Sequence, residues 1–244
     1  MIQQRFFCGG QTPAIQFAKT CLMQSGIRFS DSAGWDTENL LLDVPSFRPG
    51  DQQRVETLLS SLPKHITVWG GNLQHHSLKG FSCRDLLEDE LYLTKNAAIT
   101  ADCTMHILKP LLKQPLSNTK ALIIGWGRIG KYLAPLLMKS GCHVTVSARK
   151  EADCKYICDS DFDAVETSRI QTILPTVDLI INTVPAMILP ESPANILKID
   201  LASVKGIAGE DVLWARGLPG RYAPEQSGKL ICDTILRILK EDQA

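Results

Sequence analysis

Three glycines and the residues around them are the first feature of the chain that could do chemistry. Residues 121–124 form an apolar run typical of a strand, and Gly125, Gly127 and Gly130 follow it at Gly-x-Gly-x-x-Gly spacing. An apolar-periodic segment comes directly afterwards and predicts a helix. The first glycine allows a tight turn, the second lets backbone N–H groups approach a pyrophosphate, and the third lets helix and strand pack closely. The dinucleotide-binding residues expected here are Gly125, Gly127, Arg128, Ile129 and Gly130.

The end of the next predicted strand, residues 143–147, bears on the choice of cofactor. Sites for NAD usually place a carboxylate there for the ribose 2′-hydroxyl, whereas the 2′-phosphate of NADP is repelled by a carboxylate and prefers arginine. This chain has Ser147, Arg149 and Lys150 at that point, with Glu151 directly after them. Two cations and a hydroxyl favour NADP, while Glu151 keeps NAD as the alternative.

Two later predicted strands end in residues that could complete the site. Residues 177–183 form an apolar strand that runs into a Val-Pro pair, and residues 195–201 form the next one. In a doubly wound sheet, ligands bind beyond the carboxyl ends of the strands. We therefore expect the first strand to present Asn182, Thr183, Val184 and Pro185 to the cofactor, and the second to deliver Ser203 and Lys205 to the same edge.

Strand and helix patterns alternate along the whole chain, which predicts parallel sheets and an α/β fold class. Residues 5–8, Gly9-Gly10 and a helix over 14–24 repeat the strand, glycine, helix plan, but with two glycines only, so this turn need not bind phosphate, and an anion there is left open. We further expect a last strand of the first domain at 92–94, a bridging helix at 99–112, a turn at 217–220 and a closing helix at 225–240.

The composition points to a small-molecule partner. The chain has 244 residues, of which 44% are hydrophobic and 21% charged, and its net charge is zero. Without a basic run we expect neither nucleic-acid nor membrane binding. The N-terminus lacks the pattern of a signal peptide, and no apolar run approaches membrane-spanning length, so the sequence predicts a cytoplasmic protein.

No metal site is predicted. The eight cysteines lack a Cys-x-x-Cys pattern, and we expect most of them to be buried, reduced thiols. Cys154 and Cys158 have no nearby histidines, and the adjacent His75 and His76 are interpreted as loop residues rather than a ligand pair. The acidic residues between 85 and 90 are typical of a solvated face.

Longer motifs, in order along nearly the whole chain, resemble the A subunit of dipicolinate synthase. They are residues 63–68, 100–102, 125–130, 144–149, 182–189, 199–203 and 217–220, with Ala223-Pro224 and Gly228. The resemblance implies a doubly wound parallel sheet (Rossmann), related to the NAD-binding half of D-2-hydroxyacid dehydrogenases, at residues 99–221. It also implies a smaller α/β domain at residues 1–98 that the C-terminal helix, residues 222–244, completes.

The resemblance also implies a function. Members of the family oxidise dihydrodipicolinate to dipicolinate in spore formation, together with a flavoprotein as the B subunit, and relatives of this architecture commonly form homodimers. A dicarboxylate substrate demands cations, so Lys205 and Arg221, with Ser203, are the expected substrate-binding residues. Asp102 is the expected base and Thr100 a positioning hydroxyl, with Lys205 beside the reaction. The sequence departs from the family at residues 204–208, where a Pro-Gly-Gly stretch is usual.

Two alternatives remain open from the sequence. A D-2-hydroxyacid dehydrogenase would need a late histidine as acid/base, and no histidine follows His143. A nucleotide-binding or regulatory subunit without catalysis of its own would explain the lack of an obvious acid/base pair. Turnover assays separate these classes.

Overall fold

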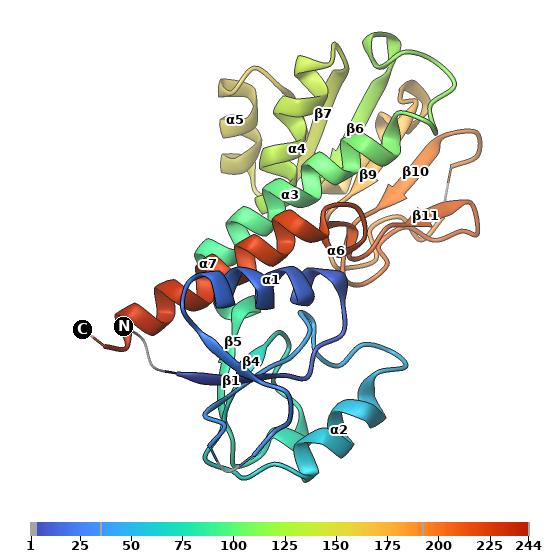
Figure 1. Cartoon of the computed structure of the whole chain (residues 1–244). Helices are drawn as coiled ribbons and strands as arrows, with labels where there is room; N and C mark the ends of the chain where they lie inside the picture. The colour runs from blue at the N-terminus through green and yellow to red at the C-terminus, as the bar shows by residue number, and fades with distance from the viewer. Residues whose placement is uncertain (1–3, 35, 192, 244) are drawn as a thin grey trace. The chain divides into compact units, whose positions relative to one another are not determined.

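The computed structural model describes residues 4–34, 36–191 and 193–243, and the chain divides into two compact units. The first unit consists of Met1–Asn96 and Pro219–Ala244, and the second of Ala97–Leu218. Each unit is built on its own parallel sheet (Figure 1). The α/β fold class predicted from the alternating patterns is therefore confirmed.

The first unit contains a five-stranded sheet in the order β2-β1-β3-β4-β5. Val55 and Leu59 of one helix pack with Leu40 and Val68 of the sheet in a single apolar core. The strands are β1 (Arg5–Cys8), β2 (Arg28–Ser30), β3 (Asn39–Leu41), β4 (Thr67–Gly70) and β5 (Ser82–Asp85), and the helices are α1 (Pro13–Gln24), α2 (Gln52–Ser60), α6 (Leu218–Tyr222) and α7 (Pro224–Glu241). Helix α7 runs beside α1 (Figure 1), and Gly228 allows the close approach, because a Cβ there would lie 2.5 Å from the Ala14 carbonyl oxygen.

The second unit contains a six-stranded parallel sheet in the order β11-β10-β9-β6-β7-β8. Its strands are β6 (Lys120–Ile124), β7 (His143–Ala148), β8 (Asp163–Glu166), β9 (Leu179–Asn182), β10 (Leu197–Asp200) and β11 (Val212–Trp214), and its helices are α4 (Arg128–Lys139) and α5 (Glu151–Asp159). Numbered within the unit, this order is the 3-2-1-4-5-6 of a Rossmann fold, with its switch point between β6 and β9. A ligand is therefore expected beyond the carboxyl ends of β6 and β9.

Helix α3 (Glu90–Leu108) corrects one prediction. Residues 92–94 lie inside this helix, so the predicted last strand there is wrong, and the fifth strand is β5 instead. The Asp89 carboxylate accepts a hydrogen bond from the Tyr92 backbone N–H at 2.7 Å, which is the bond that starts a helix. The predicted bridging helix therefore begins at Glu90 rather than Ile99.

Three other segments differ from the expectation. Residues 218–222 form the short helix α6 where a turn was predicted, although Gly217 before it has the positive φ of +64° that favours glycine. Helix α5 and strand β8 were not predicted. Both are short and carry several charged residues, so neither shows an apolar period strong enough to be recognised.

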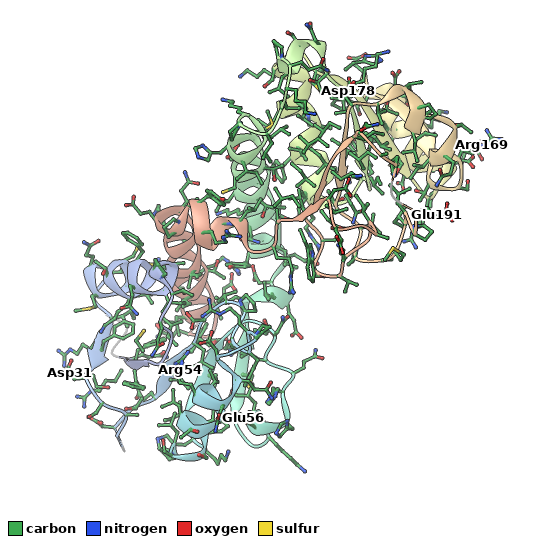
Figure 2. All side chains as sticks on the ribbon, turned by 90° about the vertical axis from the view of Figure 1, so that its right-hand side faces the viewer. Asp31, Arg54, Glu56, Arg169, Asp178 and Glu191 are labelled. Carbon is green, nitrogen blue, oxygen red and sulfur yellow. The ribbon has the colours of Figure 1, made fainter. Side chains whose placement is uncertain are left out.

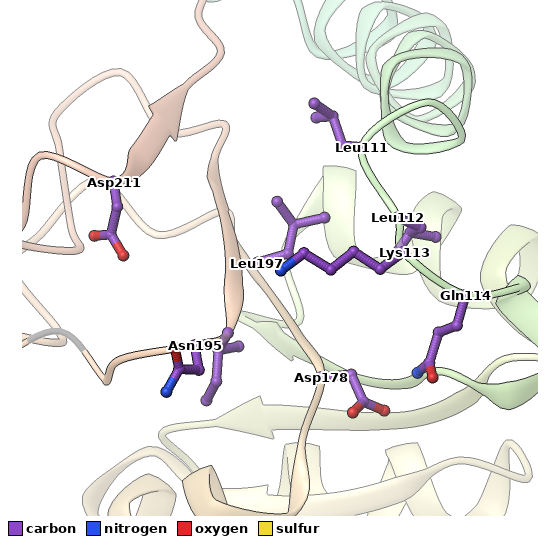
Figure 3. Close-up of a pocket in the computed structure, with 9 residues that line it drawn as sticks. Leu111, Leu112, Lys113, Gln114, Asp178, Asn195, Leu197 and Asp211 are labelled. Atoms are coloured by element: carbon purple, nitrogen blue, oxygen red, sulfur yellow. The ribbon is translucent and has the colours of Figure 1, made fainter.

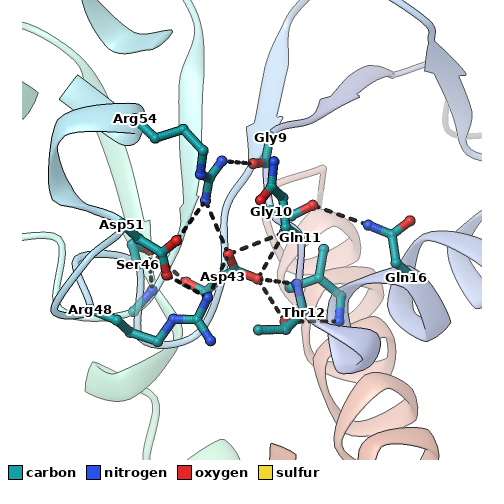
Figure 4. A network of polar contacts seen from close by, with 12 residues as sticks. Gly9, Gly10, Gln11, Thr12, Gln16, Asp43, Ser46, Arg48, Asp51 and Arg54 are labelled. Atoms are coloured by element: carbon teal, nitrogen blue, oxygen red, sulfur yellow. Dashed lines mark hydrogen bonds and ion pairs between the residues drawn. The ribbon is translucent and has the colours of Figure 1, made fainter. Parts of the chain in front are cut away.

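The turn between β1 and α1 holds a carboxylate of the protein itself (Figure 4). Asp43, 2% exposed, accepts hydrogen bonds from the backbone N–H of Gln11 and Thr12 at 3.1 and 2.9 Å and from the Thr12 hydroxyl at 2.6 Å. The guanidinium groups of Arg48 and Arg54 lie 3.4 and 3.5 Å from the same carboxylate. The donors that could have held a phosphate or a substrate anion at this turn are therefore used within the protein.

In the described part of the chain, no helix has the length and apolar character needed to span a bilayer. This agrees with the absence of a membrane-spanning run in the sequence.

Candidate functional site

The candidate site begins where β6 turns into α4. Gly125 follows the strand with a φ of +105°, a conformation that L side chains rarely adopt. Gly127 is the N-cap of α4, and no side chain caps the helix from this position. The first N–H groups of a helix have no partner within it, so they remain for a ligand or solvent, and the helix dipole adds a partial positive charge.

The three glycines of the motif are needed for different physical reasons. At Gly125 a Cβ would lie 2.6 and 2.7 Å from the side chains of Val184 and Thr183, and at Gly130 it would lie 2.2 Å from the Gly125 carbonyl oxygen. Protein packing therefore requires both of these glycines. Gly127 has an ordinary φ of −83°, and a Cβ there would meet no protein atom within 4 Å. Neither strain nor packing accounts for Gly127, which leaves the close approach of a ligand.

A cavity of about 330 Å³ lies against this turn. Its walls come from the glycine turn, the segment after β7, the segment after β8 and the segment after β9. The lining residues are Gly125, Trp126, Gly127, Ala148, Arg149, Lys150, Asp153, Thr167, Thr183, Val184, Pro185 and Ile188. The cavity thus lies at the carboxyl ends of the strands and at the switch point, where a Rossmann fold binds its ligand.

The polar groups of the cavity fit a dinucleotide. Arg149 and Lys150 are exposed directly after β7, and Asp153 on α5 places one carboxylate near them. The indole Nε1 of Trp126 is buried without a hydrogen-bond partner in the protein, so this N–H is a free donor at the cavity wall. Two cations, an unpaired donor and an uncapped helix start together suit a phosphorylated ligand.

Five residues predicted for the cofactor do not line this cavity. Arg128, Ile129 and Gly130 form the first turn of α4, where Arg128 is exposed and Gly130 buried. Ser147 is fully buried, and its hydroxyl has no hydrogen-bond partner in the protein. Asn182 is also fully buried, and its amide donates to Asp200 and to the Val184 carbonyl, each at 3.0 Å. Ser147 and Asn182 support the walls of the cavity from within.

Five lining residues were missed by sequence reasoning: Trp126, Ala148, Asp153, Thr167 and Ile188. Asp153 lies on α5 and Thr167 follows β8, two elements that the sequence pattern did not reveal. Trp126 occupies a variable position of the glycine motif, and a bulky aromatic residue inside the motif was the one available signal.

Asp200 at the end of β10 organises the loop that carries two predicted substrate residues. Its fully buried carboxylate accepts hydrogen bonds from the Asn182 amide and from the backbone N–H of Ala202, Gly206 and Ile207, over 2.7–3.1 Å. Ser203 is exposed on this loop. The half-buried Lys205 donates to the Gly209 carbonyl at 2.8 Å. One carboxylate thus joins the ends of β9 and β10 and fixes the loop between them.

The other predicted chemical residues lie outside the cavity. Asp102 and Thr100 are both on α3, where Asp102 is exposed and Thr100 is 7% exposed. Arg221 is exposed on α6 and belongs to the first unit, whereas Ser203 and Lys205 belong to the second. Trp126, Arg149 and Lys150 are therefore the cavity's polar groups, and a reaction centre would have to be assembled from other segments.

A larger cavity of about 470 Å³ opens elsewhere in the second unit (Figure 3). It includes Asp178 and Leu197, which lie at the amino ends of β9 and β10, and Figure 3 shows the Lys113 side chain extending toward Leu197. The Asp178 carboxylate already accepts from the Lys120 backbone N–H at 2.9 Å. Size alone favours this cavity, but open α/β sheets bind ligands at the opposite ends of their strands, so we assign the cofactor to the smaller one.

The cysteines show no sign of an activated thiol. All eight are free, but only Cys103, Cys142 and Cys232 are fully buried, so the expectation that most would be buried is wrong. Burial raises the pKa of the Cys142 thiol to about 11, and burial likewise raises the pKa of Cys103 and Cys232. A raised pKa keeps a thiol protonated and unreactive at neutral pH.

Comparisons with known proteins place this site in a class. Residues 94–199 match the NAD-binding domain of the D-isomer specific 2-hydroxyacid dehydrogenases. Most of this segment lies in the second unit and contains the glycine turn, β7 and β9. The second unit therefore carries a Rossmann-type NAD-binding domain, and a nicotinamide dinucleotide is the class of cofactor that such a domain takes.

Individual relatives narrow the resemblance. Over 205 residues the chain is 25% identical to the A subunit of dipicolinate synthase from Bacillus subtilis (strain 168), covering 76% of this chain and 69% of that protein. The crystal structure of the same subunit from Bacillus halodurans has a TM-score of 0.81 at 20% identity, over 97% of each chain. The apo-structure of D-lactate dehydrogenase from Escherichia coli has a TM-score of 0.62 at 11% identity, over 99% of this chain and 97% of that one. The resemblance to the A subunit of dipicolinate synthase that the motifs indicated is confirmed, and these findings support an oxidoreductase.

Proposed function

We propose that this chain is an NAD(P)-dependent oxidoreductase that acts as the A subunit of dipicolinate synthase does, oxidising dihydrodipicolinate or a closely similar dicarboxylate. The open space at Gly127, beside an uncapped helix start and a cavity of about 330 Å³, is the observation that carries the cofactor part. When bound, the nicotinamide ring supplies the hydride acceptor. The dipicolinate synthase relative supports the substrate part, together with a role in spore formation in the cytoplasm.

In this proposal the chain's own residues do three things. The amides at the start of α4, with Trp126 Nε1 and Arg149, bind the phosphates. Lys205 and Arg221, with Ser203, bind the substrate carboxylates, because charge-assisted hydrogen bonds suit a dicarboxylate. Asp102 takes the proton that the substrate ring loses, and Thr100 orients the substrate. A flavoprotein, as the B subunit of the enzyme, and a second copy of the chain are the proposed partners.

NADP is the proposed form of the cofactor, and Arg149 is its test. Arg149 lines the cavity directly after β7, where the 2′-phosphate would lie. Because a charge-assisted hydrogen bond contributes about 1.5–3 kcal/mol, we expect Arg149→Ala to weaken NADP binding roughly ten-fold or more and to leave NAD binding unchanged. Calorimetric titration of both nucleotides measures this difference.

Arg169→Ala is the matched control for that titration, because Arg169 is an exposed arginine of the same unit that does not line the cavity. Its affinity for NADP should equal that of the wild type. Equal NADP and NAD affinities that Arg149→Ala leaves unchanged would contradict the proposed 2′-phosphate site.

The proposed reaction is tested by turnover of dihydrodipicolinate with NADP, with and without the flavoprotein. We expect Asp102→Asn to lower kcat by roughly 100-fold or more with little change in cofactor affinity, because a general base typically contributes 10²–10⁴-fold. Asp159→Asn, an exposed helical aspartate of the same unit, is the control and should keep full activity. Unchanged turnover in Asp102→Asn would remove this residue from the mechanism.

A nucleotide-binding subunit without catalysis is the second candidate function. It is favoured by one observation, which is that Asp102, Thr100, Lys205, Ser203 and Arg221 all lie outside the lining of the cofactor cavity. Tight NADP binding without turnover, alone or with the flavoprotein, would support this second function over the first.

A further inference from the structure

Three side chains of the first unit that are common metal ligands come together between α2 and the loop after β4. The Nε2 atoms of His75 and His76 lie 3.6 and 3.9 Å from the Glu56 Oε1 atom, and the three potential ligand atoms all lie within 4.8 Å of one another. We propose that Glu56, His75 and His76 bind a divalent transition-metal ion, for which zinc is the best match. This site is separate from the proposed redox function and belongs to the other unit.

The distances suit zinc after small side-chain movements. Two imidazole nitrogens and one carboxylate oxygen are a usual zinc ligand set, and bonds of about 2.1 Å in a tetrahedron place ligand atoms about 3.4 Å apart. The separations from the Glu56 oxygen exceed this by only a few tenths of an ångström. Three protein ligands leave the fourth position of a tetrahedron to water.

The segments that carry the ligands are held in place by the same core. Glu56 lies on α2, as Figure 2 shows, and its neighbour Val55 is in the apolar cluster that also contains Leu73 and Leu78 from either side of the two histidines. The Asp85 carboxylate accepts from the backbone N–H of Asn72 and Leu73 and so fixes the start of the loop. The ligands are therefore presented by ordered backbone, which lowers the entropic cost of binding.

Hydrogen bonds around His75 favour the tautomer that binds metal. The Gln52 amide nitrogen lies 3.0 Å from the Glu56 Oε1 atom and 3.3 Å from His75 Nε2, so it donates toward the position that a cation would take. His75 Nδ1 lies 2.8 Å from the Ser77 hydroxyl, which can accept the Nδ1 proton. This pairing leaves the Nε2 lone pair free, as in many metal sites where the second nitrogen donates to a neighbour. Phe47 stacks on the His75 ring at 4.1 Å and limits its rotation.

The histidine pair was interpreted from the sequence as loop residues because adjacent histidines do not define a site alone. The third ligand, Glu56, belongs to the preceding helix, and the fold brings it to the pair. A bound ion would join α2 to the loop between β4 and β5.

Zinc titration of the full-length protein against a chromophoric chelator tests the proposal. We expect one zinc ion per chain at this site, and binding at least about ten-fold weaker in His75→Ala and in Glu56→Gln, since loss of even an outer partner of a ligand costs 10–100-fold. Glu56→Gln changes a half-buried side chain without changing its size, so it keeps the test valid if His75→Ala fails to fold. His65→Ala, an exposed histidine of the same unit, is the control and should bind zinc like the wild type.

The eight cysteines could also bind zinc, so the ligands must be identified directly. Long-range proton–nitrogen NMR spectra resolve the imidazole nitrogens of the five histidines. Zinc should shift the Nε2 signals of His75 and His76 and leave those of His65, His106 and His143 in place. Zinc binding that Glu56→Gln does not weaken, or spectra in which the His75 and His76 signals stay unchanged, would overturn the proposal.

Discussion

Replacing Gly127 by valine is expected to weaken nicotinamide dinucleotide binding by about 5- to 150-fold, because forcing side-chain atoms into an occupied contact costs roughly 1–3 kcal/mol. In the protein alone the new side chain finds open space, since a Cβ at Gly127 has no protein atom within 4 Å. The backbone tolerates it as well, because φ is −83°. The free energy of unfolding should therefore change little while affinity falls. Calorimetric titration and urea unfolding measure the two quantities separately.

Two further glycine variants make this prediction selective. Gly220→Val introduces the same side chain at another exposed glycine with open space, and it should leave dinucleotide affinity unchanged. Gly130→Ala should instead lower the free energy of unfolding by roughly 1–3 kcal/mol, because its Cβ would lie 2.2 Å from a backbone oxygen. Undiminished affinity in Gly127→Val would mean that no ligand approaches this turn closely, and the cofactor assignment would fail.

Removal of the Asp200 carboxylate is expected to produce the largest loss of stability. In Asp200→Ala the Asn182 amide and three backbone N–H groups lose their acceptor in a fully buried place. An unsatisfied buried donor costs roughly 1–3 kcal/mol, and partial relaxation of the loop reduces the sum, so we expect a loss of about 4 kcal/mol in the free energy of unfolding. Urea denaturation monitored by circular dichroism measures it.

Glu210→Ala is the control for this experiment, because Glu210 is an exposed acid of the same unit. We expect it to change the free energy of unfolding by less than about 0.5 kcal/mol. A change in Asp200→Ala no larger than that of the control would show that the loop at 202–207 does not depend on this carboxylate.

The sequence determined the local parts of the cofactor site. A strand, three spaced glycines and a helix are contiguous, and their meaning depends on backbone geometry over a few residues, so Gly125, Gly127 and Gly130 could be placed without the fold. The alternation of strands and helices likewise predicted two parallel sheets. The longer motifs indicated the relation to dipicolinate synthase.

Only the tertiary structure decided which distant residues meet. Asp43 reaches the start of α1 and Asp200 joins the ends of two strands, although nothing in their local sequence distinguishes them from surface aspartates. Trp126 contributes an unpaired buried donor, and Glu56 meets two histidines from another segment. Each of these roles depends on burial and on contacts between segments far apart in the chain, and residue type and spacing encode neither.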